Sequence, residues 1–259
     1  GRPRQCIGTT TGERVIASFG MYDMPHATAA YDRLWQAIRS ELGRGPATLN
    51  RTDDLWAQWQ SPDLLVSQTC SLPYRARLYS QVSLVGTPDY GLRDCPPGYY
   101  YSYIVRRSGE RRSLRDLARY GKIAFNDPLS QSGWAAPVAY LSTRGLRPMD
   151  MVETGAHIAS AHAVLDGSAD YAAIDVITYQ MWSRADPDAF TGLETFVRTE
   201  PTPALPLITA KSRDPKPIAR AVTRAIDAMP AADRDILHLQ GLIPIEEDTY
   251  RALPIPPLP

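Results

Sequence analysis

Short apolar runs separated by helical patterns restrict what this 259-residue chain can fold into more than any other feature. Residues 15–19, 64–67 and 81–85 are short and apolar, as buried strands are. Residues 25–42 repeat apolar side chains at helical spacing, and Pro25 suits the first turn of that helix. This alternation predicts an α/β fold with mostly parallel sheets flanked by helices.

Two proline-rich segments interrupt the pattern. Residues 94–98 and 201–203 are typical of turns or chain crossings, and strands and helices restart between them. We therefore expect two lobes. Residues 98–199 form lobe 2, which is inserted into a discontinuous lobe 1 made of residues 1–97 and 200–259. Folds of this kind bind ligands in a cleft where strands end and helices begin.

Charge and hydropathy argue against several classes of protein. Basic and acidic residues number 28 each, so no net charge favours nucleic acid or an anionic membrane. No apolar run reaches the roughly 18 to 20 residues that a membrane-spanning helix needs. Residues 1–11 lack the apolar core of a signal peptide, but a mature chain would look the same, so no cytoplasmic location follows.

The three cysteines are Cys6, Cys70 and Cys95. We predict a disulfide between Cys70 and Cys95, which would fit an oxidising compartment. Two separate buried thiols are the alternative. Cys6 lies in a polar stretch, where we expect it to be exposed.

The segment Phe125-Asn-Asp-Pro-Leu-Ser-Gln-Ser-Gly-Trp134 carries the clearest chemical signal. A predicted strand ends, a polar turn follows and a helix begins. The N–H groups of residues 131–134 lie at the positive end of that helix, and the Ser130 and Ser132 hydroxyls add donors suited to a tetrahedral oxyanion. A serine-rich helix cap that binds nothing would have the same sequence.

This segment resembles the Asp-Pro-x-Ser-x-Ser-Gly loop of the ABC-transporter substrate-binding proteins for phosphate, phosphite and phosphonate. Those proteins have the two-lobed type II periplasmic-binding-protein fold. The resemblance is close across lobe 2 and holds in outline elsewhere. It also rests on the strand Tyr100–Arg106, on Ser113-Leu114-Arg115-Asp116-Leu117, on Thr154-Gly155-Ala156-His157, and on residues 163–175.

The resemblance implies a binding protein rather than an enzyme, located in the periplasm or otherwise outside the cytoplasm. Its partners would be a small oxyanion-bearing ligand and a membrane permease, with no cofactor, metal or nucleic acid, and we expect a monomer. The residues that the resemblance places at the ligand are Ser130, Gln131, Ser132 and Gly133 on the oxyanion loop, His157, and Tyr100 in the cleft.

The chain departs from relatives that bind aminoalkyl phosphonates. Those relatives place carboxylates around the amine, whereas Ile177 and residues 204–206 offer none here. An aminophosphonate is therefore not expected.

Two polar positions have two open interpretations each. His157 lies near a helix start, where a bound anion would favour the charged imidazolium, or it is a structural cap. Asp175 ends a strand that should reach the cleft, where it accepts a bond from the ligand or caps the following helix.

The first lobe is harder to interpret. The loops that carry Tyr22 and Ser67-Gln68-Thr69 follow predicted strands and should face the cleft. Trp56 and Trp59 either join them or pack in the core. A cleft lined by rings would suit a ligand with an apolar or cationic body.

Three other functions compete with this interpretation. Ser130, His157 and Asp175 suggest a hydrolase triad, but no Gly-x-Ser-x-Gly elbow is present. Nucleotide-binding glycine loops and zinc-ligand spacings are also missing. A ligand-sensing domain and a divergent member that binds another organic nutrient remain alternatives.

Overall fold

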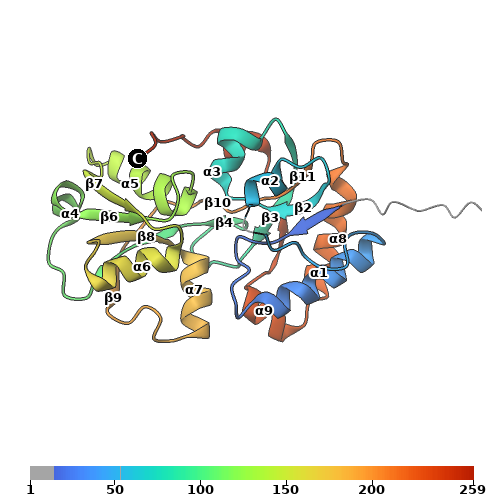
Figure 1. Cartoon of the computed structure of the whole chain (residues 1–259), viewed down its shortest axis with the longest axis horizontal. Helices are drawn as coiled ribbons and strands as arrows, with labels where there is room; N and C mark the ends of the chain where they lie inside the picture. The colour runs from blue at the N-terminus through green and yellow to red at the C-terminus, as the bar shows by residue number, and fades with distance from the viewer. Residues whose placement is uncertain (1–14, 53) are drawn as a thin grey trace, which may run out of the picture.

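The computed structural model describes residues 15–52 and 54–259 and arranges them in two lobes (Figure 1). Each lobe contains a five-stranded sheet, and Val82 and Ile123 lie in different sheets. The prediction of a two-lobed α/β fold is confirmed. Cys6 lies outside the described residues.

The sheet of lobe 1 combines strands from both ends of the chain. In spatial order they are β1 (Ile16–Ser18), β2 (Leu64–Gln68), β11 (Leu207–Ala210), β3 (Val82–Asp89) and β12 (Gly241–Ile243). The strand β11 returns from lobe 2 and enters between β2 and β3, antiparallel to both. The remaining elements of this lobe are α1 (Thr28–Leu42), α2 (Leu55–Trp59), α3 (Ser71–Pro73), the π-helix η1 (Tyr74–Leu78), α8 (Pro215–Asp227), α9 (Ala231–Leu237) and α10 (Glu247–Arg251).

The sheet of lobe 2 has the order β7 (Asp150–Glu153), β6 (Lys122–Phe125), β8 (Tyr171–Asp175), β5 (Ser102–Arg107) and β9 (Leu193–Arg198). Alternate residues of β6 serve opposite faces. Ile123 and Phe125 join one buried cluster and Ala124 joins the other, as the two-residue period of a strand requires. The helices that cover these faces are α4 (Leu114–Tyr120), η2 (Gln131–Ala135), α5 (Ala136–Ser142), α6 (His157–Asp166) and α7 (Val176–Ala185).

Both sheets are mixed, so the prediction of mostly parallel sheets is wrong. The strand β5 enters from the first crossing and pairs antiparallel with β8 and β9, whereas β6 pairs parallel with β7 and β8. A strand that arrives from the other lobe has no crossover helix to set its direction. The sequence pattern shows strand positions but not these reversals.

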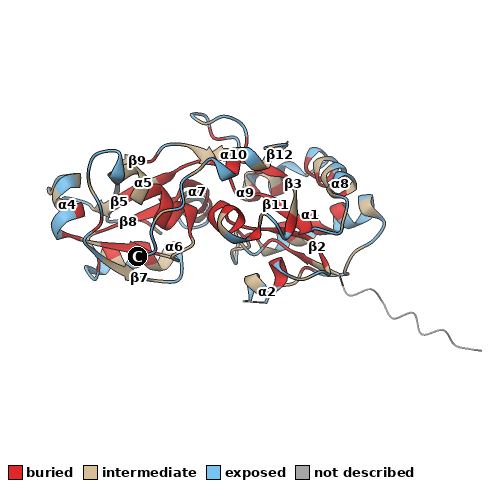
Figure 2. Ribbon diagram, turned by 90° about the horizontal axis from the view of Figure 1, so that it is seen from above, coloured by how far each residue is buried: buried red, intermediate tan, exposed pale blue. Residues whose placement is uncertain are grey.

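The two crossings pair with each other between the lobes. Their strands β4 (Tyr99–Tyr100) and β10 (Thr202–Pro203) form a two-stranded antiparallel ribbon. The largest buried cluster of lobe 1 continues past this ribbon to Val176, Ile177 and Met181 on α7. Buried residues therefore extend from one lobe into the other, as Figure 2 shows.

The observed helices and strands differ from the predicted pattern in three places. The helix expected at Pro25 begins at Thr28, because Met24 accepts bonds from the N–H groups of Ala27 and Thr28 in a preceding turn. The helix α9 ends at Leu237, and the strand β12 that follows it was not predicted. The short helix α10 was also not predicted.

The C-terminal tail leaves α10 in lobe 1 and ends on lobe 2 (Figure 1). The carbonyl of Pro254 accepts a 2.7 Å bond from Arg75 of lobe 1, and that of Pro257 accepts a 3.0 Å bond from the indole of Trp134 in lobe 2. This proline-rich segment is therefore bonded to both lobes.

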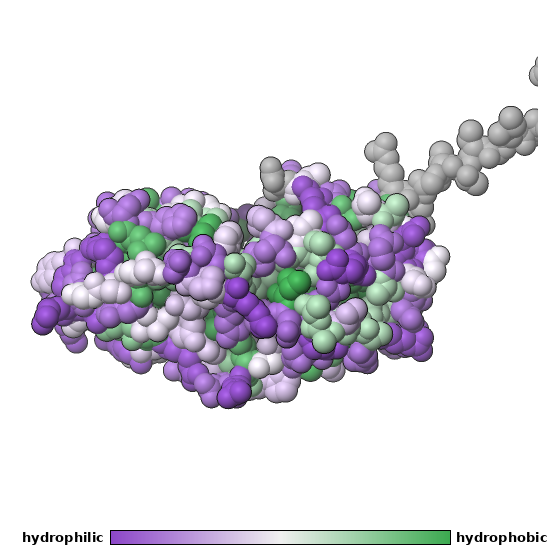
Figure 3. Space-filling view, turned by 90° about the horizontal axis from the view of Figure 1, so that it is seen from below, coloured by the Kyte–Doolittle hydropathy of each residue, from purple (hydrophilic) through white to green (hydrophobic). Residues whose placement is uncertain are grey.

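The surface in Figure 3 is mainly hydrophilic, with small hydrophobic patches on both lobes. Within the described ranges, every helix is too short or too polar to cross a membrane.

Candidate functional site

A cavity of about 560 Å³ lies between the two lobes. Both lobes contribute side chains to it. From lobe 1 come Gly20, Met21, Tyr22, Met24, Asp54, Leu55, Trp56, Trp59, Cys70, Pro73 and Leu205. From lobe 2 come Asn126, Asp127, Leu129, Ser130, Ser132, Gly155, Ala156, His157, Ile158, Asp175, Thr178 and Trp182. Five of the predicted site residues, Tyr22, Ser130, Ser132, His157 and Asp175, are thereby brought together.

The predicted oxyanion loop follows β6 and opens into η2, whose first turn is wider than an α-helical turn. Pro137 has no N–H, so the carbonyl of Ser132 lacks its donor within the helix. The Ser102 hydroxyl donates to that carbonyl at 2.9 Å instead. Ser130 caps the start of this helix, and Ser132 lies on the cavity lining.

Most backbone N–H groups of this helix start are already paired. Those of Trp134 and Ala135 donate to the Ser130 carbonyl, and that of Gly133 donates to the Ser130 hydroxyl at 2.9 Å. The N–H of Gln131 reaches the sulfur of Cys70. Among the described residues, only Ser132 of positions 131–134 keeps an N–H without a partner. Fewer than four N–H groups at positions 131–134 are therefore free of protein partners in this structure.

His157 begins α6, and its Nε2 lies 2.8 Å from the Ser132 hydroxyl. Burial lowers the pKa of His157 to about 4, so the imidazole is neutral at pH 7. A neutral imidazole beside an anion site can take up a proton when a negative charge arrives.

Asn126 directly follows β6 and lines the cavity, and it was not among the predicted site residues. Its side chain packs against Gly133, where an added Cβ would lie 1.8 Å from the Asn126 Oδ1. That oxygen is buried and has no hydrogen-bond partner among the described residues. Only glycine at position 133 allows Asn126 to lie in this place on the cavity wall.

Asp175 caps α7 and also meets lobe 1. Its Oδ1 accepts from the N–H groups of Ile177 and Thr178, and its Oδ2 accepts from the Tyr22 hydroxyl at 2.5 Å. Burial raises the pKa of this carboxyl to about 6, although the three hydrogen bonds oppose the rise. The capping role is therefore present, and the same carboxylate joins the two lobes at the cavity wall.

Tyr100 lies behind the cavity rather than on its lining. Its hydroxyl is buried without a geometric partner among the described residues. Burial raises the pKa of Tyr100, the nearby Cys70 and Asp175 raise it further, and Ser132 opposes the rise. The ring is therefore next to the site, on the ribbon that joins the lobes.

The polar side chains at the end of β2 do not reach the cavity. The hydroxyl of Ser67 lies 2.7 Å from that of Ser18, and Gln68 donates to Tyr90 and to the carbonyl of Leu205. Thr69 bonds to its own neighbour's carbonyl. All three residues are buried supports of the lobe 1 sheet.

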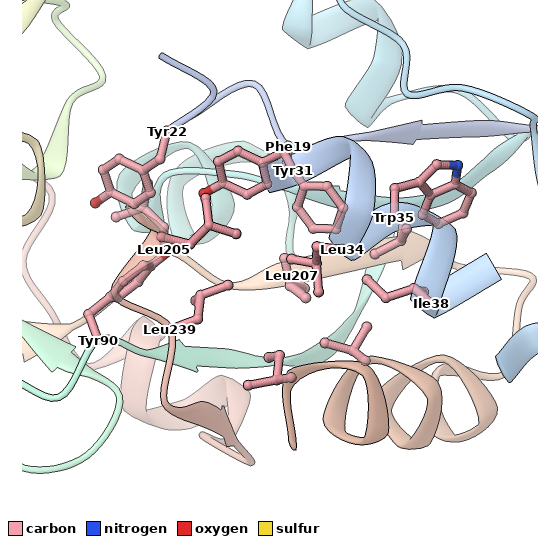
Figure 4. Packing of buried hydrophobic residues seen from close by; sticks show 14 of the residues in the cluster. Phe19, Tyr22, Tyr31, Leu34, Trp35, Ile38, Tyr90, Leu205, Leu207 and Leu239 are labelled. Atoms are coloured by element: carbon pink, nitrogen blue, oxygen red, sulfur yellow. The ribbon is translucent and has the colours of Figure 1, made fainter. Parts of the chain in front are cut away.

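Tyr22 lies at the edge of the lobe 1 core, where its ring meets that of Tyr90 edge to face (Figure 4). Next to it, Met21 and Met24 line the cavity from the turn that delays α1. The helix α2 adds Trp56 and Trp59, whose rings also meet edge to face. The face that lobe 1 presents to the cavity is therefore largely apolar.

A buried arginine holds the oxyanion loop against lobe 1. Arg75 is 4% exposed and donates to the Gln131 side chain at 2.7 Å, while Pro254 accepts from the same guanidinium group. Burial lowers the pKa of Arg75. Gln131 thus faces Arg75 and is not on the cavity lining, and a cation lies directly behind the loop.

The predicted disulfide is absent, since Cys70 and Cys95 are both free thiols. Cys70 lines the cavity and accepts from the N–H of Gln131, and burial raises its pKa. Cys95 packs at the edge of the lobe 1 core. The two side chains serve different surroundings, which cysteine spacing does not reveal.

Sequence reasoning missed Asn126, Arg75, Met24 and Trp182 as neighbours of the site. Asn126 stood in the quoted loop, and its place at a predicted strand end was a usable signal. Arg75 and Trp182 reach the site only through contacts between the lobes, for which the sequence has no local signal.

A protein-family model for phosphonate ABC-transporter periplasmic substrate-binding proteins matches residues 70–250. No curated protein sequence matches the chain. PhnD1 from Prochlorococcus marinus, solved with methylphosphonate, is similar with a TM-score of 0.69 at 15% identity, covering 87% of this chain and 90% of the other. A binding protein of an ABC phosphonate transporter from Pseudomonas aeruginosa has a TM-score of 0.67 at 13% identity, with coverages of 86% and 78%.

A Xanthomonas citri protein bound to ATP is also similar, with a TM-score of 0.64 at 13% identity and coverages of 87% and 91%. At these identities the structures show a shared fold, and the match to the family model extends over most of the chain. The chain belongs to the phosphonate-type family of periplasmic substrate-binding proteins of ABC transporters, which are binding proteins and not enzymes.

Proposed function

We propose that this chain captures a small oxyanion-bearing ligand, phosphonate-like in its anionic group, in the cavity between its lobes. It then delivers the ligand to the membrane permease of an ABC importer and works outside the cytoplasm as a monomer. We also propose that residues 98–199 move as one lobe against residues 1–97 and 200–259, with the paired crossings between them.

The observation that carries this proposal is the group of polar atoms around Ser132. Its hydroxyl and its unpaired N–H, the Nε2 of His157 and the side chain of Asn126 meet at one wall of the cavity. The Ser130 hydroxyl lies 3.5 Å from that of Ser132. The hydroxyls of Ser130 and Ser132, the Ser132 N–H and a protonated His157 Nε2 can supply several donors to one tetrahedral anion.

A cation outside the cavity favours the negative charge of the ligand. Arg75 approaches through Gln131 without entering the cavity, so it contributes a positive field but no direct ion pair. Each hydrogen bond to a charged group contributes roughly 1.5 to 3 kcal/mol. Three or four such bonds, less the cost of immobilising the ligand, are enough for the about 8 kcal/mol that micromolar binding requires.

One of the similar structures was solved with methylphosphonate and another with ATP. Their shared chemistry is a tetrahedral phosphorus oxyanion, which is the part of the ligand that we assign here. The fold itself is compatible with groups of very different size attached to that anion.

Isothermal titration calorimetry with methylphosphonate, phosphite and phosphate tests this proposal. We expect at least one of them to bind, and we expect Ser132→Ala to weaken that binding about tenfold or more. Ser142→Ala is the matched control, because Ser142 is exposed at the far end of the same helical segment. The proposal is wrong if none of these anions binds, or if Ser132→Ala binds as tightly as the parent protein.

A further inference from the structure

The cavity is much larger than the anion that its polar wall can hold. A volume of about 560 Å³ lies in the range of pockets that enclose organic molecules, roughly 300 to 1,000 Å³. The donors around Ser132 occupy one part of its wall. The rest of the space must be filled by another part of the ligand or by water.

Apolar side chains from both lobes surround that remaining space. Lobe 1 contributes Met21, Met24 and Trp56, and lobe 2 contributes Ile158 and Trp182. All of them are half-buried, so each presents apolar surface to the cavity. Methionine side chains adapt to irregular partners, and indole rings offer large flat contacts.

The ring of Trp56 is held in place by its neighbours. Trp59 meets it edge to face with ring centroids 5.3 Å apart, and the Arg77 guanidinium lies 5.5 Å from its centroid. Trp59 is itself fixed by a bond from its indole N–H to the Gln68 carbonyl. A ring that is supported in this way and still half-exposed can contact a ligand with little loss of motion.

The charges on the lining restrict the ligand further. Among the described residues that line the cavity there is no lysine or arginine, whereas Asp54, Asp127 and Asp175 contribute carboxylates. Asp54 and Asp127 each use one oxygen to accept a backbone N–H. Additional negative charge away from the oxyanion wall would therefore meet the Asp54 carboxylate on the lining, whereas Arg77 beside Trp56 is not a lining residue.

From the size, the lining and the charge, we propose that the ligand is an organic oxyanion with an apolar, ring-bearing body and no second anionic group. The oxyanion lies at Ser132 and His157, and the body packs against Trp56, with Trp182 across the cavity. This inference rests on the proposed function and adds the part of the ligand that the anion site leaves open.

Calorimetry with phenylphosphonate, methylphosphonate and 4-carboxyphenylphosphonate tests it. We expect phenylphosphonate to bind about tenfold more tightly than methylphosphonate, because the ring buries apolar surface. The added carboxylate should remove most of that gain. Trp56→Ala should reduce the phenyl-to-methyl ratio at least fivefold while methylphosphonate affinity changes less than about twofold.

Trp56→Phe keeps a ring and should restore most of the ratio, and Tyr120→Ala, which alters a side chain 72% exposed, should change nothing. If methylphosphonate binds and phenylphosphonate binds no more tightly, this inference is wrong and the proposed function stands. An unchanged ratio in Trp56→Ala would also overturn it. If no anion binds, the proposed function fails and this inference fails with it.

Discussion

The two faces of the cavity use their polar residues in opposite ways. On the lobe 2 face, the Ser132 hydroxyl and the His157 Nε2 meet at 2.8 Å on the cavity wall, and Ser130 and Asn126 lie on the same lining. On the lobe 1 face, Ser67 and Gln68 are bonded within their own lobe and the cavity receives methionine and tryptophan side chains. Under the proposed function, lobe 2 binds the anion, and apolar side chains from lobe 1, together with Ile158 and Trp182 of lobe 2, contact what is attached to it.

The contrast has a physical basis in the different free-energy cost of leaving polar donors and apolar side chains without a ligand. A polar donor that loses water without gaining a partner costs free energy, and a bound anion that accepts from it removes that cost. Apolar side chains carry no such penalty and can tolerate many shapes. One face can therefore demand a particular group while the other accepts a range of bodies.

Alanine substitution of two glycines, one on each face, should give the largest difference in methylphosphonate affinity between the faces. At Gly133 an added Cβ would lie 1.8 Å from the Asn126 Oδ1, whereas at Gly20 it would lie 3.0 Å from a methyl group of Leu55. We expect Gly133→Ala to displace Asn126, to lower stability by about 1 to 3 kcal/mol and to weaken methylphosphonate binding more than tenfold. Urea denaturation and calorimetry measure both effects.

Gly20→Ala is the matched variant on the lobe 1 face. The Leu55 methyl is the end of a flexible side chain and can move, so methylphosphonate affinity should stay within about threefold of the parent. Equal losses of affinity in the two variants would remove the distinction between the faces.

Substitution of Asp175, which contacts Tyr22 across the two faces, should give the next largest effect, a change in folding stability. Burial raises the pKa of Asp175 from 3.8 to about 6, so the folded state favours the protonated carboxyl. The stabilisation is complete below pH 3.8 and is lost as the pH rises through about 6. Asp175→Asn removes the buried charge and should therefore be more stable than the parent at pH 8, by about 2 kcal/mol.

The gain should disappear at pH 4, which urea denaturation at both pH values can show. Asp170→Asn is the opposite control. Burial raises the pKa of Asp170, but the bonds from Arg112 and the Lys122 N–H outweigh it and the net shift is downward. That variant should lose stability at pH 8. A destabilised Asp175→Asn at pH 8 would mean that the carboxylate charge holds the lobes together.

The smallest effect concerns the tail that joins both lobes. Trp134→Phe keeps the ring that packs 5.0 Å from Phe125 but removes the donor to the Pro257 carbonyl. We expect a loss of at most about 1 kcal/mol in urea denaturation. In a chain truncated after Pro256 the same substitution should cost nothing further, and an undiminished cost there would show that the tail bond is not its cause.

The sequence predicted lobe 2 better than lobe 1 for a physical reason. Ser130, Ser132 and His157 belong to local strand-to-helix motifs whose geometry follows from short stretches of chain. The lobe 1 sheet depends on the pairing of β11 and β12 with β3, which lies far from both in the chain. Such long-range contacts leave no local pattern.

Two of the predictions that failed share this cause. The sheets are mixed because β5 and β11 enter from the other lobe, and Cys70 pairs with a backbone N–H instead of Cys95. Gln131, which the motif places at the ligand, is likewise reached by Arg75 from the other lobe. Each of these depends on how the lobes meet.

The most direct measurement is the pKa of His157 with and without bound methylphosphonate, followed by NMR of labelled histidine. Without ligand, burial holds this pKa at about 4. An oxyanion at Ser132 and His157 would stabilise the imidazolium, so the account predicts a rise of at least about one unit on saturation. Loss of the signal in His157→Gln identifies it among the four histidines. A pKa that stays near 4 in the saturated complex would contradict the placement of the anion on lobe 2.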